Sequence, residues 1–93
     1  MKTVMFYEVA ADGLPKAMAH IEAHRARLAA FHARGELLMA GPFANPMEGA
    51  LGIFTTRAAA EAFIRGDPFI EHGVVAKWRL VEWNEVLAPT PSR

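Results

Sequence analysis

The chain contains no cysteine, and its single serine, Ser92, is the second-to-last residue. Without cysteine there can be no disulfide and no thiolate metal site. Because serine is confined to the C-terminal tail, catalysis by a Ser or Cys nucleophile is excluded as well. A chain without cysteine also fits a reducing compartment, which favours the cytoplasm.

The sequence also lacks any excess of charge and any long apolar run. Its 10 Lys and Arg residues equal its 10 Asp and Glu residues, so it lacks the basic face of a general nucleic-acid binder and any electrostatic attraction to anionic membranes. Glu8 and Asp12 interrupt the N-terminal segment too early for a signal peptide, and no run approaches the ~20 apolar residues of a membrane helix. We therefore expect a cytoplasmic protein with neither a nucleic-acid nor a membrane partner.

A glycine-rich phosphate-binding loop is absent too. Gly41-Pro42, Gly49 and Gly52 form neither a dinucleotide-binding nor a Walker pattern. We accordingly expect no cofactor.

The pattern that is present predicts the element order β-α-β-β-α-β. Strands are expected at 3–9, 37–40, 50–55 and 75–86 (the last with a bend near residue 84), helices at 15–34 and 57–65, a loop at 45–48 and a short helical turn at 69–72. Gly35 is placed to end the first helix, and Thr56 to cap the second. This order indicates an α+β, ferredoxin-like fold: a four-stranded antiparallel sheet with two helices on one face. Residues 1–88 would form one domain, with 89–93 as a flexible tail.

Both faces of the predicted sheet are apolar. In the first strand, Val4 and Phe6 lie on one face and Met5, Tyr7 and Val9 on the other. In the last strand, Trp78 and Leu80 lie on one face and Val81 and Trp83 on the other. Two helices cover only one face, and soluble monomers rarely expose the large apolar patch that would remain on the other. Burying ~800 Å² per partner would contribute more than about 10 kcal/mol before association costs. We therefore predict a homodimer or higher homo-oligomer through the open face, rather than a monomer with an apolar surface.

The first helix carries a histidine on its core-facing side. The apolar positions on this face are Leu14, Ala17, Met18, Ile21, Leu28 and Phe31, and at 100° per residue His24 falls on the same stripe. A buried imidazole has two nitrogens to satisfy, so a polar group must meet it there. The structural alternative is a core-edge histidine with a backbone partner.

Asp67 is the natural partner for His24. Its position before Pro68 is typical of a helix N-cap, and one carboxylate oxygen could cap while the other accepts from the histidine. Such a pair would fix the imidazole tautomer, as a general base requires. If it is not catalytic, the pair would simply hold the two helices together.

The other histidines have simpler interpretations. His20 and His72 are expected at the surface, and His32 as a charge partner of the helix C-terminus. His20 and His24, four residues apart, could share a metal, but Glu22 is misplaced for the zincin pattern. We expect no metal.

Four segments together resemble the YCII-related family. They are His-Arg-Ala-Arg-Leu at 24–28, Gly-Glu-Leu-Leu-Met-Ala-Gly-Pro-Phe at 35–43, Asp-Pro-Phe at 67–69 and Gly-Val at 73–74. The resemblance extends from the first strand to Trp83. It implies a dimeric α/β barrel of ferredoxin-like subunits, with the family's histidine and aspartate matching His24 and Asp67. One enzyme of this kind is a dehydrochlorinase of chlorinated hydroxyhydroquinones, although the resemblance identifies no pocket residues and so no substrate.

These observations lead to a small, cofactor-independent lyase- or isomerase-like enzyme, dehydrochlorinase-like in its chemistry. His24 would be the general acid/base and Asp67 its orienting partner, with Gly41, Pro42, Phe43 and Phe69 lining a cleft for a small cyclic or aromatic molecule. A non-catalytic dimeric ligand-binding or regulatory module is the alternative, because the fold hosts unrelated functions. A haem- or oxygen-handling role rests on fold analogy alone.

Overall fold

The computed structural model describes residues 1–89 and has the element order expected, including the short helical turn after Asp67, with one additional 3₁₀ turn. The elements are β1 (Lys2–Val9), α1 (Gly13–Ala33), β2 (Leu37–Pro42), the 3₁₀ turn η1 (Pro46–Glu48), β3 (Ala50–Phe54), α2 (Arg57–Arg65), α3 (Pro68–Glu71) and β4 (Val75–Trp83). Most of the expected 89–93 tail lies outside the described residues.

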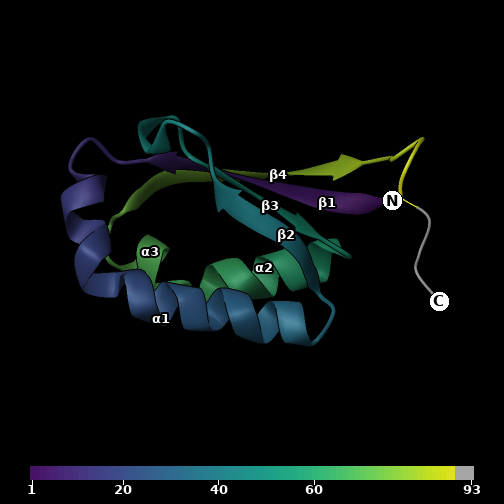
Figure 1. Ribbon diagram of the computed structural model, residues 1–93, viewed down its shortest axis with the longest axis horizontal. Helices are drawn as coiled ribbons and strands as arrows, with labels where there is room; N and C mark the ends of the chain where they lie inside the picture. The colour runs from purple at the N-terminus through teal and green to yellow at the C-terminus, as the bar shows by residue number, and fades with distance from the viewer. Residues whose placement is uncertain (90–93) are drawn as a thin grey trace.

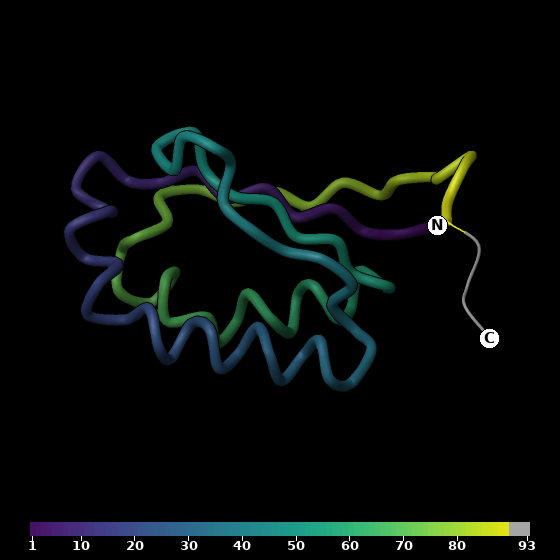
Figure 2. Tube along the Cα trace, in the orientation of Figure 1, coloured from purple at the N-terminus to yellow at the C-terminus, as the bar shows by residue number. Residues whose placement is uncertain are grey.

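The four strands form one antiparallel sheet in the order β2-β3-β1-β4, and the three α-helices all lie on one side of it (Figure 1). This is the predicted ferredoxin-like arrangement. The trace in Figure 2 shows β1 and β4 running together past the ends of the helices, toward the N-terminus. They remain paired as far as Lys2 and Trp83.

Helix boundaries follow from local chemistry. Thr56 accepts a hydrogen bond from the backbone N–H of Ala59, so α2 begins where a capping hydroxyl predicts. At the end of α1, Gly35 has a φ of 77°, the left-handed conformation that glycine adopts readily after a helix. The cap at Thr56 thus explains where α2 begins, and Gly35 explains where α1 ends.

Other boundaries differ from expectation. Helix α1 begins at Gly13, two residues before Pro15, because the first turn of a helix tolerates proline. Strand β2 continues through Gly41 and Pro42, beyond the predicted end. It is an edge strand, so the backbone position where Pro42 has no N–H faces away from β3, and no hydrogen bond of the sheet is lost. The 45–48 loop contains η1, and β4 ends at Trp83 rather than 86.

The core lies between the helices and the inner face of the sheet. It is formed by Met5, Tyr7, Phe31, Leu37, Phe54, Ala59, Ala60, Phe63, Ile64 and Val75. Phe63 packs edge-on against Phe31, with ring centroids 5.2 Å apart, which ties α2 to α1. Met18 was wrongly grouped with the core-facing side of α1: its side chain is 78% exposed, because it lies at the edge of the stripe, beyond the reach of the sheet.

The opposite face of the sheet is uncovered in a single chain. A shallow hollow there is lined by Val4, Phe6, Leu51, Ile53, Val81 and Trp83. Trp83 is 45% exposed, and Arg79 lies over the Phe6 ring at 4.3 Å. The apolar character predicted for both faces is therefore observed. Within residues 1–89, no helix has both the length and the apolar character needed to cross a bilayer.

Candidate functional site

A buried carboxylate joins three elements at the centre of the site. Asp67 is fully buried (0% exposed), and its Oδ1 lies 2.7 Å from His24 Nδ1 on α1. The Tyr7 hydroxyl on β1 donates to Asp67 Oδ2 at 2.6 Å, and the backbone N–H of Phe69 donates to Oδ1 at 3.1 Å. Because a carboxylate is an acceptor, the His24 proton in this contact resides on Nδ1.

The two carboxylate oxygens of Asp67 accept hydrogen bonds from different groups than we expected. Oδ1 of Asp67 accepts from both His24 and the capping N–H of Phe69. Oδ2 is thereby left for Tyr7, a residue that the sequence placed only on one of the two apolar faces of the sheet. A buried tyrosine hydroxyl needs a partner, and the strand alternation that points Tyr7 inward was the available signal.

The end of α2 is held in place by Arg27. Its Nε donates to the carbonyl of Phe63 at 3.0 Å, and its Nη2 to that of Ala62 at 2.8 Å. These are among the last carbonyls of α2, where a cation is favourable. Gly66 allows this approach, since a Cβ built at Gly66 would lie 2.7 Å from the guanidinium. Arg27 thus fixes the segment that carries Asp67, a role that the sequence analysis missed.

Burial governs the electrostatics of Tyr7. Desolvation raises the pKa of its hydroxyl far above the ordinary value of 10.0, and the neighbouring Asp67 charge and hydrogen bond raise it further. The Arg27 guanidinium opposes this shift. Tyr7 therefore remains a neutral donor to Asp67 throughout the physiological pH range.

A cavity of about 280 Å³ opens beside His24. It is lined by Met5, Tyr7, Leu14, Ala17, Ile21, His24, Arg25, Leu28, Ala40, Gly41, Pro42, Pro46, Ala50, Leu51 and Phe69. Of the predicted cleft residues, Gly41, Pro42 and Phe69 are brought together with His24. Phe43 is not among the lining residues, and its side chain is 37% exposed at the surface.

The second nitrogen of His24 is available to a ligand. Its ring stacks on Phe69, with centroids 3.8 Å apart and planes within 6°, and the side chain is 13% exposed. Nε2 makes no hydrogen bond within residues 1–89, and no fully buried side-chain N or O there lacks a partner. Nε2 therefore retains contact with solvent, whereas Nδ1 is fixed by Asp67.

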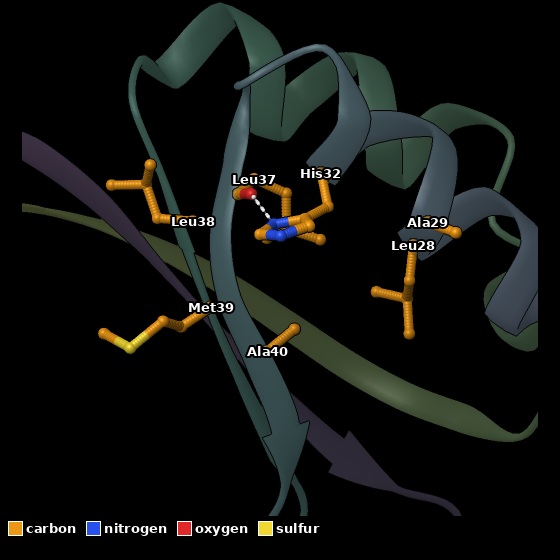
Figure 3. Close-up of a pocket in the computed structure, with 7 residues that line it drawn as sticks. All are labelled: Leu28, Ala29, His32, Leu37, Leu38, Met39 and Ala40. Atoms are coloured by element: carbon orange, nitrogen blue, oxygen red, sulfur yellow. Dashed lines mark hydrogen bonds between the residues drawn. The ribbon is translucent and has the colours of Figure 1, made fainter.

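A second hollow of about 300 Å³ lies farther along α1 (Figure 3). His32 forms its polar wall and is the basic residue in the last turn of α1, as expected. Its Nδ1 also donates to the carbonyl of Leu37 at 2.8 Å, so it links α1 to β2. Leu38 and Met39 project from the other side of β2 (Figure 3), where a register shift interrupts the pairing with β3. Leu28 and Ala40 border both this hollow and the His24 cavity.

The remaining histidines pair with each other. The rings of His20 and His72 stack with centroids 3.8 Å apart and planes within 3°, so His20 is half-buried rather than fully solvated. Residues 1–89 contain no group of three or more His, Cys, Asp or Glu side chains arranged to hold a metal ion. His20 and His24 thus have separate protein partners.

Comparisons with known proteins agree with this fold. The model of the YCII-related domain matches residues 1–84. Among solved structures, the 5-chloro-2-hydroxyhydroquinone dehydrochlorinase of Burkholderia phenoliruptrix, in complex with 2,5-dihydroxybenzoquinone, aligns with a TM-score of 0.75 and 20% identity, covering 90% of this chain and 94% of that chain. No curated protein matches the sequence. Similarity at this identity establishes the shared fold.

Proposed function

The chain belongs to the YCII-related family, and from this premise we propose that it is a small enzyme that moves protons on a small cyclic or aromatic substrate without a cofactor. The observation that carries the proposal is His24 itself. Its Nδ1 is held by the buried Asp67, and its Nε2 is unpaired at an apolar cavity. A fixed tautomer with one free nitrogen is the arrangement of a general acid/base.

The geometry supports a simple division of roles. His24 Nε2 takes a proton from a ring hydroxyl or from a carbon beside a carbonyl. Asp67 keeps the imidazole oriented and stabilises the positive charge that it acquires. Tyr7 and the Phe69 N–H hold Asp67 in turn. When the released electron pair expels a leaving group from the adjoining carbon, the reaction is an elimination; when the proton returns to another atom, it is an isomerisation.

The cavity favours a single-ring substrate. At about 280 Å³ it is at the lower end of the range for small-molecule sites, and Phe69 and Leu28 offer apolar contacts to a ring. The structural relative is named for dehydrochlorination of a chlorinated hydroxyhydroquinone. We therefore place loss of HCl from a chlorinated, hydroxylated ring first among the reactions to test. In the balanced sequence, His24 takes a hydroxyl proton and returns a proton to the chlorine-bearing carbon, which gives the keto tautomer. It then takes a proton from a second hydroxyl, whose C–O bond becomes C=O while the adjoining ring double bond shifts toward the C–Cl carbon and chloride leaves with the C–Cl electron pair.

Turnover can be measured by incubating the protein with 5-chloro-2-hydroxyhydroquinone and a set of chlorinated phenols and lactones, and following chloride release. We expect His24→Gln to reduce the rate by about 10²–10⁴-fold, the usual contribution of a general acid/base. His72→Gln is the matched control, since this histidine stacks only on His20, and it should retain full activity. Undiminished turnover in His24→Gln would refute the catalytic role, and specific ligand binding without turnover would favour the ligand-binding module instead.

We also propose that two copies pack through the apolar face defined by Val4, Phe6, Leu51, Ile53, Val81 and Trp83. Light scattering should give a molar mass of about twice 10.2 kDa. Val81→Glu places a charge within that face and should yield the monomer, because an unpaired buried charge is costly. Glu22→Lys, on the exposed side of α1, should leave the mass unchanged. A stable monomer at micromolar concentration would contradict the proposal.

A further inference from the structure

Arg25 brings a permanent positive charge to the His24 cavity. Of the lining residues within 1–89, it is the one with a fixed charge, and no carboxylate side chain lines the cavity. Apart from His24 and Tyr7, the other walls are apolar side chains and the exposed Gly41-Pro42 segment. A single cation in such a setting selects between neutral and anionic ligands.

The position of Arg25 on α1 is unusual for a surface arginine. It follows Ile21 by four residues and precedes Leu28 by three, and both of these residues line the cavity. That spacing places Arg25 at the edge of the cavity-facing stripe, two turns after Met18, where its exposed side chain borders the cavity. His24, one residue earlier, is turned toward Asp67. Neighbouring positions on α1 therefore present a base and a cation to the same space.

Arg25 has no protein partner within the described part of the chain. Residues 1–89 provide no carboxylate within 4.0 Å of it, no hydrogen-bond acceptor and no aromatic ring beneath it. Arg27 is engaged by two carbonyls, Arg34 by Glu36 and Arg79 by the Phe6 ring. Arg65 likewise has no partner within residues 1–89, but it does not line the His24 cavity. The five N–H donors of Arg25 are thus available to something that enters the cavity.

We propose that Arg25 determines specificity by binding an anionic oxygen, a carboxylate or an ionised hydroxyl, on the substrate ring. The substrate class is then a small anionic ring compound, whose charged end lies at the guanidinium and whose reactive position lies at His24 Nε2. This assignment rests on the proposed function of the cavity. It does not require that His24 be catalytic, because anion binding is measured without turnover.

The test compares two ligands of matched size, 4-hydroxybenzoate and 4-hydroxybenzamide, by isothermal calorimetry at low ionic strength. The wild-type protein should bind the benzoate about ten-fold more tightly, as a charge-assisted hydrogen bond at a partly exposed site allows, and added salt should reduce that preference. Arg25→Met should abolish the preference while the benzamide affinity stays within about two-fold. Arg57→Met is the matched control, because Arg57 pairs with Glu61 on α2, and it should keep the preference.

The outcomes separate this proposal from the catalytic one. His24→Gln should retain the preference for the benzoate, whether or not any turnover is found. Equal affinities in the wild-type protein, an unchanged preference in Arg25→Met, or no binding of either probe at millimolar concentration would overturn the role of Arg25. A lower molar mass of Arg25→Met in light scattering would overturn it as well, since it would assign the guanidinium to a contact between copies.

Discussion

Replacing Tyr7 with phenylalanine tests the buried contact on which the site depends. The substitution removes only the hydroxyl that donates to Asp67 Oδ2 at 2.6 Å, and it leaves the aromatic ring in the core. Asp67 is fully buried, so no solvent can replace the lost donor. A hydrogen bond to a charged group contributes about 1.5–3 kcal/mol, and near pH 8 we expect Tyr7→Phe to be less stable than the wild type by that amount.

The pH dependence of this difference gives the sharper test. Burial raises the pKa of Tyr7 in the folded protein above its unfolded value near 10, so its stabilising contribution is fully present below pH 10. It is lost as the pH rises further, because the unfolded chain then releases the proton while the folded chain keeps it. The loss amounts to about 1.4 kcal/mol per pH unit. The gap between wild type and Tyr7→Phe should therefore shrink by about 1.4 kcal/mol by pH 11.

Urea unfolding of both proteins at the same concentration, from about pH 8 to pH 11, measures this gap. Lysine titrations are common to both proteins and cancel in the comparison. Tyr7 is the only tyrosine in the chain, so phenolate absorbance reports it alone and should appear only on unfolding. A gap that stays constant across this range, or a folded protein whose phenol titrates near pH 10, would refute the buried contact.

Two further substitutions test how the site is supported. Gly66→Ala should destabilise the protein by about 1–3 kcal/mol in thermal unfolding, because the new Cβ displaces the Arg27 guanidinium from its two carbonyls. The control is Gly41→Ala, whose Cβ would meet nothing within 4 Å and which should change the free energy of unfolding by less than about 0.5 kcal/mol. Equal effects of the two substitutions would contradict this role of Arg27. Thr56→Ala should lower the free energy of unfolding by about 0.5–2 kcal/mol, because it removes the hydroxyl that caps α2. Thr56→Ser keeps a hydroxyl and should retain most of that stability. An unaltered melting temperature in Thr56→Ala would show that the cap contributes nothing.

Much of the fold was predictable because local signals agreed with the tertiary structure. Thr56 and the breaker after Arg65 delimit α2 at the residues predicted, and Gly35 ends α1 as its backbone conformation requires. Strand alternation also identified the two apolar faces of the sheet. The edge strand β2 was predicted too short, because whether Pro42 interrupts pairing depends on which side of the strand has a neighbour.

The site was predicted in part. Helical spacing placed His24 toward the interior and the Asp-Pro pattern marked Asp67, and the structure joins them at 2.7 Å. Three contacts could not be predicted, because they depend on the packing of elements far apart in the sequence. They are the hydrogen bond from Tyr7 to Asp67, the hydrogen bonds from Arg27 to α2, and the stacking of His20 on His72. No spacing along the chain encodes such contacts. Arg25 also left a signal, a charge at the edge of the apolar stripe, but its significance depends on the cavity that it borders.

The use of one carboxylate for several purposes has a consequence for how this site can evolve. Asp67 caps α3, binds a strand residue and orients His24, so a substitution there perturbs folding and geometry together. The opposite wall, around Gly41 and Pro42, belongs to an edge strand with exposed residues. Mutations there can reshape ligand preference at little cost in stability. The architecture thus separates the His24–Asp67 pair, whose geometry the fold constrains, from a wall whose residues can change with little effect on the fold.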